Sequence, residues 1–222
     1  MKYLLHIDTS TDTGTIALSG NGQLIATRTN QESRNHASSI NNMIQAVLAD
    51  SSLSLPAIDG IVVCAGPGSY TGLRIGLATA KGLCYALDKP LLLDNRLTLL
   101  SYQNYIQYPD ARATWVPMLI AREKEYFISI YDEKFNCTLT PRHISADELK
   151  NYVSHYENIR FITNEPPDII NKMEITVFNV ISDVTINLKW WLLYAFEQYN
   201  CNNIVNLSTA EPFYLKQVYT HK

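Results

Sequence analysis

The glycines of this chain are confined to its first part. All nine lie at or before Gly82, and the rest of the 222-residue sequence contains none. Glycine is the residue that lets a backbone turn tightly or approach a ligand closely. A site that needs glycine loops is therefore expected only in the first part. The same change in composition places a domain boundary near residue 100, which gives an N-terminal lobe over 1–100 and a C-terminal lobe over 101–222.

Hydrophobic periodicity predicts a similar order of elements in both lobes. In the first lobe, strands are expected at 2–8, 14–19, 23–30, 58–65 and 90–93, and helices at 36–51, 72–87 and 97–106. In the second lobe, strands are expected at 114–120, 125–132, 135–141, 159–163 and 175–178, and helices at 146–156 and 183–199. This order predicts a two-lobed α/β protein built from duplicated βββαβα units with mixed sheets. The final segment is expected to pack back on the first lobe.

Composition excludes several classes of protein. Apolar residues make up 46% of the chain and charged residues 18%, which suits a folded globular protein. The net charge of −3 lacks the basic excess of a protein that binds nucleic acid on its own. The four cysteines match neither a CxxC metal site nor a dense disulfide scaffold. Because no signal-peptide pattern and no membrane-length apolar run is present, we expect a cytoplasmic protein without membrane contact.

The most distinctive local feature is the glycine-rich segment GPGSYTGLRIG at 66–76, between a buried strand and a helix. Glycines at such a junction can leave backbone N–H groups free at a helix N-terminus, where an anion is favoured. The segment is neither a Walker A loop nor a GxGxxG fingerprint. Two interpretations stay open: a phosphate site and a tight turn that is rich in glycine.

The helix after this segment has one face with almost no side chain. Gly72, Gly76, Ala80 and Cys84 recur at every fourth position. Glycine inside a helix costs about 1 kcal/mol relative to alanine, so a compensating close contact is expected. Either the molecule's own sheet or a helix of a partner chain can supply that contact.

Four segments together resemble the TsaB (YeaZ) family. They are the segment LLHIDTST at 4–11, GPGSYTGLRIG at 66–76, Ala121-Arg122 with Glu125-Tyr126, and AEPFYL at 210–215. They occur in the order of the family and span nearly the whole chain, and the segment at 66–76 is the most specific. The resemblance implies the two-lobed actin-like ATPase (RNase H-like) fold, whose duplicated βββαβα lobes agree with the element order.

The resemblance also implies a function. In that family the protein is a non-catalytic subunit of the bacterial machinery that makes N6-threonylcarbamoyladenosine in tRNA. It binds and activates a catalytic paralogue, TsaD, and the small ATPase TsaE joins the complex. Contact with tRNA is expected to be indirect, and a homodimer is expected when TsaD is absent. The implied partner interface lies on the first-lobe helices, at Ile40, Met43, Ile44, Val47, Gly72, Leu73, Gly76 and Ala80.

Two features argue against a catalytic role for this chain. TsaD holds a metal through two histidines one helical turn apart, but here His36 is followed at i+4 by Ile40. Nucleotide binding in the superfamily uses glycine loops on both lobes, and the second lobe has no glycine. We therefore expect no catalytic residue, no metal and no intrinsic cofactor. Ile120 stands where many family members have an aspartate, so no role is assigned to Arg122.

Two other functions stay open. One is an enzyme, either a metallopeptidase or an ATP-dependent small-molecule kinase, although the required ligand sets are not evident. The other is a nucleotide sensor, in which ATP or ADP binds at the cleft or at the junction with the partner. Its candidate contacts are Asp8, Ser10, Thr11, Gly66, Gly68, Ser69 and Arg74.

Overall fold

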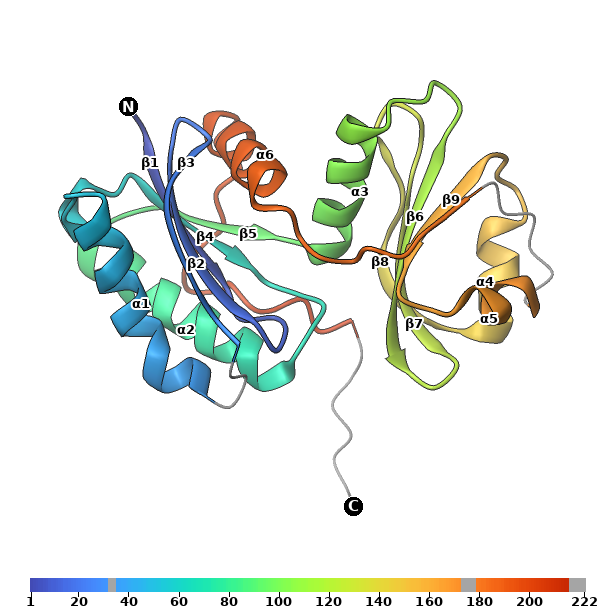
Figure 1. Ribbon diagram of the computed structural model, residues 1–222, viewed down its shortest axis with the longest axis horizontal. Coiled ribbons are helices and arrows are strands. Elements are labelled where there is room, and N and C mark those ends of the chain that lie inside the picture. Colours follow the sequence, from blue (N-terminus) through green and yellow to red (C-terminus); the bar gives the residue numbers. More distant parts are fainter. Residues whose placement is uncertain (32–34, 173–178, 216–222) are drawn as a thin grey trace, which may run out of the picture. The chain divides into compact units, whose positions relative to one another are not determined.

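The protein forms two compact units in the computed structural model, which describes residues 1–31, 35–172 and 179–215 (Figure 1). Unit 1 comprises Met1–Arg96 and Asn187–Phe213, and unit 2 comprises Leu97–Ile186 and Tyr214–Lys222. None of the helices in the described ranges is long and apolar enough to cross a membrane.

Unit 1 is a five-stranded mixed sheet with helices on both faces. Its strands are β1 (Tyr3–Asp8), β2 (Gly14–Gly20), β3 (Gln23–Asn30), β4 (Gly60–Cys64) and β5 (Leu91–Asp94), in the order β3-β2-β1-β4-β5. Strands β1, β2 and β3 are antiparallel, and β4 and β5 run parallel to β1. The turn between β2 and β3 has positive φ at both Asn21 and Gly22, which is the backbone that tight hairpins require.

The helices of unit 1 divide between the two faces of its sheet. Helices α1 (His36–Asp50) and α2 (Tyr70–Leu87) cover one face, and α6 (Leu188–Asn200) covers the other (Figure 1). A short 3-10 helix, η2 (Leu55–Ala57), precedes β4. Alternation along β1 explains the division. Leu5 and Ile7 join the apolar cluster with residues of α1 and α2, whereas His6 meets the ring of Trp191 on α6.

Unit 2 repeats the strand arrangement of unit 1. Its strands are β6 (Thr114–Arg122), β7 (Glu125–Tyr131), β8 (Cys137–Ser145), β9 (Ile159–Thr163) and β10 (Asn179–Ile181), in the order β10-β9-β6-β7-β8. Taken from β8 to β10, the sheet has three antiparallel strands, β8, β7 and β6, followed by β9 and β10, which run parallel to β6. Unit 1 has the same arrangement. The expected two-lobed fold with duplicated βββαβα units is therefore confirmed.

The helices of unit 2 are α3 (Arg96–Gln107), α4 (Ala146–Val153) and α5 (Pro167–Lys172). The N-terminus of α4 has the capping box that Ser145 and Glu148 are suited to form. Helix α5 is absent from the elements expected from the sequence. The expected strand at 175–178 lies outside the described residues, and β10 begins just after it.

The two units exchange their last helices. Helix α3 follows β5 of unit 1, yet Leu97 and Leu100 pack with Trp115 and Ile162 in the core of unit 2. Helix α6 follows β10 of unit 2, yet it belongs to unit 1. Residues 187–213 have their contacts in unit 1, so the range 101–222 expected for the second lobe is too long, whereas the packing of a late segment on the first lobe agrees with the expectation. Within this range, the buried residues of α6 are Trp191, Leu192 and Ala195.

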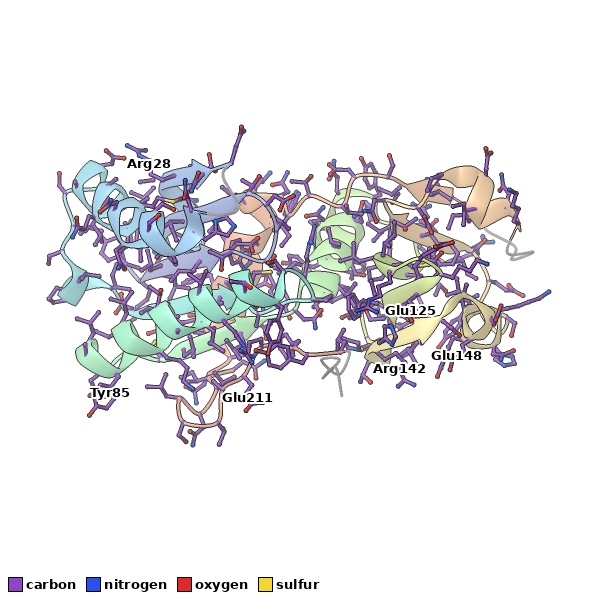
Figure 2. All side chains as sticks on the ribbon, turned by 90° about the horizontal axis from the view of Figure 1, so that it is seen from below. Arg28, Tyr85, Glu125, Arg142, Glu148 and Glu211 are labelled. Atoms are coloured by element: carbon purple, nitrogen blue, oxygen red, sulfur yellow. The ribbon has the colours of Figure 1, made fainter. Side chains whose placement is uncertain are left out.

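The segment after α6 runs along the edge of the unit 1 sheet. Val205 forms a bridge with Leu91 of β5, and Phe213 donates its backbone N–H to the carbonyl of Ala65. Between them, the ammonium group of Lys81 on α2 donates to the carbonyl of Ala210, 3.1 Å away. Glu211 follows on this strap (Figure 2). Val205 therefore pairs with the open edge of β5, and the AEPFYL motif is held on unit 1 through Ala210 and Phe213.

A buried carboxyl group attaches α6 to the sheet. The indole nitrogen of Trp191 donates to Oδ2 of Asp94, at the end of β5, over 2.7 Å. Burial raises the pKa of Asp94 to about 7, and the bond from Trp191 only partly opposes this effect. On the same face, burial lowers the pKa of His6 to about 3, so this histidine is neutral and bonds to the hydroxyl of Ser19.

We predict that Asp94→Asn stabilises the protein above pH 7. The folded-state pKa of Asp94 lies above its unfolded value of 3.8, so the folded state binds more protons between pH 3.8 and about 7. Stability from this group is fully present below pH 3.8 and is lost as the pH rises to about 7. Each pKa unit of difference is worth about 1.4 kcal/mol. An asparagine oxygen still accepts from Trp191 but carries no charge.

Urea unfolding at pH 5 and pH 8 measures this effect. Asp94→Asn should flatten the fall in unfolding free energy between the two pH values. As a control, Trp191→Phe removes the donor, so it should lower stability more at pH 8 than at pH 5. A lower stability of Asp94→Asn than of the native protein at pH 8 would refute the account.

Candidate functional site

The parallel strands of unit 1 bring polar side chains together at their carboxyl ends. β1 ends at Asp8, β4 at Cys64 and β5 at Asp94, on three neighbouring strands. This edge is where open α/β sheets bind their ligands. Asp8 is 8% exposed, and its Oδ1 accepts the backbone N–H of Ser10 at 2.8 Å. Burial raises the pKa of Asp8, while its bonds to Ser10 and the charge of Arg96 lower it.

The thiol of Cys64 lies beside these groups but is not suited to nucleophilic chemistry. Its sulfur is 3.7 Å from the hydroxyl oxygen of Ser10, to which it donates. Burial, with the nearby charge of Asp8, raises the pKa of Cys64 well above its usual value. A buried thiol that stays protonated is a packing group rather than a nucleophile.

The glycine-rich segment packs directly on the loop that follows β1. The backbone N–H of Ser69 donates to the carbonyl of Ser10 over 2.7 Å. A Cβ on Gly68 would overlap that same carbonyl oxygen. Gly66 has a φ of +115°, and its carbonyl accepts the backbone N–H of Arg96. The glycines are thus explained by close contact between two backbone segments, as the tight-turn interpretation requires.

The N-terminus of α2 uses several of its N–H groups within the chain. Ser69 is the N-cap, and its hydroxyl oxygen accepts from the backbone N–H of Gly72 at 3.2 Å. The N–H of Leu73 donates to the carbonyl of Ser69. The N–H of Ser69 itself points back to Ser10 and not outward. A phosphate role for this loop stays a prediction, and its glycines do not require one.

The structure gathers some of the predicted nucleotide contacts and separates others. Asp8, Ser10, Gly66, Gly68 and Ser69 lie together where the two loops touch. Arg74 is exposed one turn into α2, with its guanidinium group 4.1 Å from the centre of the Tyr70 ring. The hydroxyl of Thr11 donates to the carbonyl of Thr13 within its own loop.

The bare face of α2 is directed inward, which corrects its assignment to a partner interface. A Cβ on Gly72 would overlap the backbone oxygen of Thr9, and a Cβ on Gly76 would overlap Oγ1 of Thr9. Thr9 also donates its hydroxyl to the carbonyl of Gly72 over 2.7 Å. Leu73 and Ala80 on the same helix are buried. Contact with the chain's own β1 and the loop after it compensates these glycines, so the second of the two interpretations left open was wrong.

The apolar residues of α1 also belong to the core of unit 1. Ile40, Ile44 and Val47 are buried in the same cluster as Leu5 and Ile7, and Met43 packs against it half-buried. Ile40, Ile44 and Val47 are therefore used in the protein's own core, and of the four predicted interface residues on α1 only Met43 stays partly accessible. The amphipathic stripe read from the sequence is correct, but it covers the protein's own sheet.

The outward face of α2 carries a different set of residues. Thr71, Ala78, Gly82 and Tyr85 are exposed, with Tyr85 84% exposed at the end of the helix (Figure 2). No heavy atom of the described chain lies within 4 Å of a Cβ built on Gly82. The i, i+7, i+11, i+14 spacing of these four residues is visible in the sequence. The sequence analysis did not identify this outward face, because the four-residue spacing of the inward glycines was the stronger pattern.

His36 has a structural role at the start of α1. Its Nε2 lies 2.9 Å from the carbonyl oxygen of Thr11, and its ring packs over Gly14, where a Cβ would come 2.8 Å from Nδ1. Ile40, one turn later, is in the core. In the described ranges, no group of three or more His, Cys, Asp or Glu residues is arranged to hold a metal ion.

Ile120 and Arg122, to which the sequence assigned no function, line a cavity of about 730 Å³ in unit 2. Ile120 is 41% exposed at the end of β6. None of the residues that were predicted to bind a ligand lines this cavity.

Comparisons with known proteins agree with this architecture. The model of the family described as "TsaD: tRNA N6-adenosine threonylcarbamoyltransferase" matches residues 24–150. A Haemophilus influenzae protein, "tRNA threonylcarbamoyladenosine biosynthesis protein TsaB", is 34% identical over 133 residues, which cover 59% of this chain and 55% of that protein. A Thermosipho melanesiensis tRNA N6-adenosine threonylcarbamoyltransferase is 32% identical over 101 residues, 46% of this chain and 31% of the relative.

Solved structures share the fold. "YeaZ from Pseudomonas aeruginosa" superposes with a TM-score of 0.80 at 21% identity, covering 97% of this chain and all of that one. The matched segment thus spans about half of the curated TsaB relative and about a third of the transferase, whereas the fold match extends over the whole YeaZ chain.

We predict opposite effects from two equal substitutions on α2. Gly76→Ala should destabilise the protein by about 1–3 kcal/mol, because the added methyl group meets Thr9 in a closely packed contact. Gly82→Ala should stabilise it by up to about 1 kcal/mol, because the exposed helix gains propensity and the methyl group meets nothing in the described chain. Chemical denaturation of both variants tests this pair. Equal effects of the same sign would show that the inward face has been assigned wrongly.

Proposed function

The chain belongs to the TsaB/YeaZ branch of the family that the TsaD model describes, and on this premise we propose that it is a non-catalytic partner subunit of a TsaD-type transferase. In this role it binds and activates the catalytic paralogue that forms N6-threonylcarbamoyladenosine in tRNA. The names of its relatives support the pathway, since one is a TsaB protein and others are the transferase itself.

The outward face of α2 is the observation that carries the proposal. Gly82 lies inside a helix, where glycine costs about 1 kcal/mol relative to alanine. The described part of this chain offers no close contact that compensates this cost. Tyr85, one turn further, exposes 84% of its surface. A partner helix packed against Ala78 and Gly82 would use the absence of side chains there and would bury the ring of Tyr85.

The partner that this face would take is the TsaD-type paralogue. The family model matches residues 24–150 of this chain, a range that includes α1 and α2. Two chains with related first units can pair through equivalent helices in a near-symmetric contact. The same face would support a homodimer when the paralogue is absent. Joining of a TsaE-type ATPase and an indirect contact with tRNA are further parts of the proposal.

The non-catalytic character of this subunit is supported by residues that have other tasks. His36 is held by Thr11 and packs over Gly14, and the position one turn later is filled by the core residue Ile40. Cys64 is buried and protonated. These residues therefore serve packing, which fits a subunit whose contribution is the surface it offers to the catalytic paralogue.

We predict that Gly82→Leu prevents complex formation without unfolding the protein. The leucine would fill the gap that a partner helix needs, while the position is exposed and its Cβ would have no heavy atom of the described chain within 4 Å. Size-exclusion chromatography with light scattering, on this chain mixed with the TsaD-type protein of the same organism, measures the complex. Tyr85→Ala should weaken the complex by at least about tenfold, as a large aromatic contact does when it is truncated.

A matched control places the same bulky side chain on the other face of unit 1. Asn200→Leu, at the exposed end of α6, should leave the complex intact. A complex that forms equally with Gly82→Leu and with Asn200→Leu would rule out the outward face of α2 as the interface. The absence of any complex of the native chain, together with hydrolysis of ATP or peptide by this chain alone, would favour an enzyme instead.

We further propose that ATP or ADP binds only when the partner is present. Asp8, Ser10 and the loop at 66–69 lie at the ligand-binding edge of the sheet, which supports such a site, but the N–H of Ser69 already bonds to Ser10. Additional groups from the paralogue would then be needed.

Isothermal titration calorimetry tests this proposal. Nucleotide should give heat with the complex and none with this chain alone. Asp8→Asn should reduce the affinity in the complex, and Asp12→Asn, an exposed aspartate in the following loop, is the matched control. Binding of equal affinity by the isolated chain would contradict the shared site, and no heat in either case would remove the nucleotide from the proposal.

A further inference from the structure

The cavity in unit 2 is enclosed by four separate elements. It lies between the end of β6, the start of β7, the helix α4 and the helix α5. A backbone hydrogen bond joins two of these elements: the N–H of Ala146, the first residue of α4, donates to the carbonyl of Lys124 in the β6–β7 turn over 2.9 Å. Its volume of about 730 Å³ falls within the range of about 300–1,000 Å³ typical of small-molecule sites.

The walls of the cavity combine apolar and cationic side chains. Ile120 and Ile169 both line it, and they are 41% and 38% exposed although they are large and apolar. The cationic residues around them are Arg122, Lys124, Lys150 and Lys172. Three acidic residues, Glu123, Asp147 and Glu165, also line the cavity. Four cationic and three acidic residues therefore line the cavity, so groups of both signs are available to a ligand.

A buried carboxylate forms the floor. Glu165 is only 9% exposed, and its Oε1 accepts the hydroxyl of Tyr126 over 2.6 Å. Burial and the contact with Glu165 raise the pKa of Tyr126, so the phenol stays protonated and acts as the donor. The other carboxylate oxygen, Oε2, has no hydrogen-bond partner within the described ranges of the chain. Oε2 is not among the fully buried atoms, so a donor that enters the cavity can reach it, and a charged donor would bond to it most strongly.

We propose that this cavity binds a small zwitterion of about dipeptide size. Its protonated amino group would donate to Glu165 on the floor, its apolar body would pack against Ile120 and Ile169, and its carboxylate would meet the cationic rim. This arrangement uses three features of the cavity: the open acceptor on Glu165, the two exposed isoleucines, and Lys124 and Lys172 in the lining. The proposal is independent of the subunit function, since none of these residues lies on α2 or in unit 1.

Charge separation across the cavity distinguishes this ligand from a simple anion. A phosphate or a free carboxylate would be attracted by Lys124 and Lys172 but repelled by the carboxylate on the floor. An apolar amine would satisfy Glu165 but would make no use of Lys124 and Lys172. A molecule with both charges and an apolar body between them is the one that suits all of the lining groups.

Methyl NMR on the full-length protein tests the proposal. The methyl groups of Ile120 and Ile169 are the reporters, and the probes are Leu-Leu, N-acetyl-Leu-Leu, Leu-Leu amide and inorganic phosphate. Leu-Leu should shift both methyl groups saturably. N-acetyl-Leu-Leu lacks the ammonium group and Leu-Leu amide lacks the carboxylate, so each should bind at least tenfold more weakly.

Variants connect each charge to its residue. Glu165→Gln keeps an acceptor for Tyr126 but loses the charge, so it should weaken Leu-Leu about tenfold and leave N-acetyl-Leu-Leu unchanged. Lys172→Ala should weaken Leu-Leu but not Leu-Leu amide. Glu133→Gln, which makes the same charge change at an exposed position of the β7–β8 turn, is the control and should have no effect.

Three results would overturn the proposal: no saturable shift with Leu-Leu, equal binding of Leu-Leu to Glu165→Gln and Glu133→Gln, or stronger binding of phosphate alone than of Leu-Leu. If Glu165→Gln does not fold, the comparison of Leu-Leu with its acetylated form on the native protein decides the question. Equal affinity of these two probes would then reject the proposed role of Glu165.

Discussion

Close contact between α2 and the loop after β1 is the constraint on which unit 1 depends. Thr9 bonds through its hydroxyl to the carbonyl of Gly72, and the places where Gly72 and Gly76 lack a Cβ are filled by Thr9. Ser69 and Gly68 fix the same loop one turn earlier through Ser10. This contact holds the carboxyl end of β1 against the helix, and therefore sets the position of Asp8 and the direction of both faces of α2.

Because the inward face of α2 is used within the chain, only its outward face remains for a partner. In the proposed function, stability and association would be carried by different residues of one helix. Gly76 serves the fold, whereas Gly82 and Tyr85 contribute little to it. The surface proposed for pairing is therefore not part of the protein's own core.

The buried carboxyl groups of the two units differ in their surroundings. In unit 1, Asp94 at the end of β5 accepts from Trp191 of α6, and Asp8 accepts from the backbone of Ser10 in the loop after β1. In unit 2, Glu165 accepts from Tyr126 through one oxygen and also lines a cavity. Each of the three uses one oxygen within the described chain, so it is the position of Glu165 in a cavity that supports a ligand there.

The sequence by itself determined the order of the elements, apart from the short helix α5, and the family, because periodicity and motifs act over short stretches of chain. It did not decide which face of α2 is inward, since small residues at four-residue spacing suit close packing against any neighbour, and only the position of Thr9 distinguishes them. Nor did it reveal that α6 returns to unit 1 or that Glu165 lies beside Ile120, because both depend on contacts between residues far apart in the sequence.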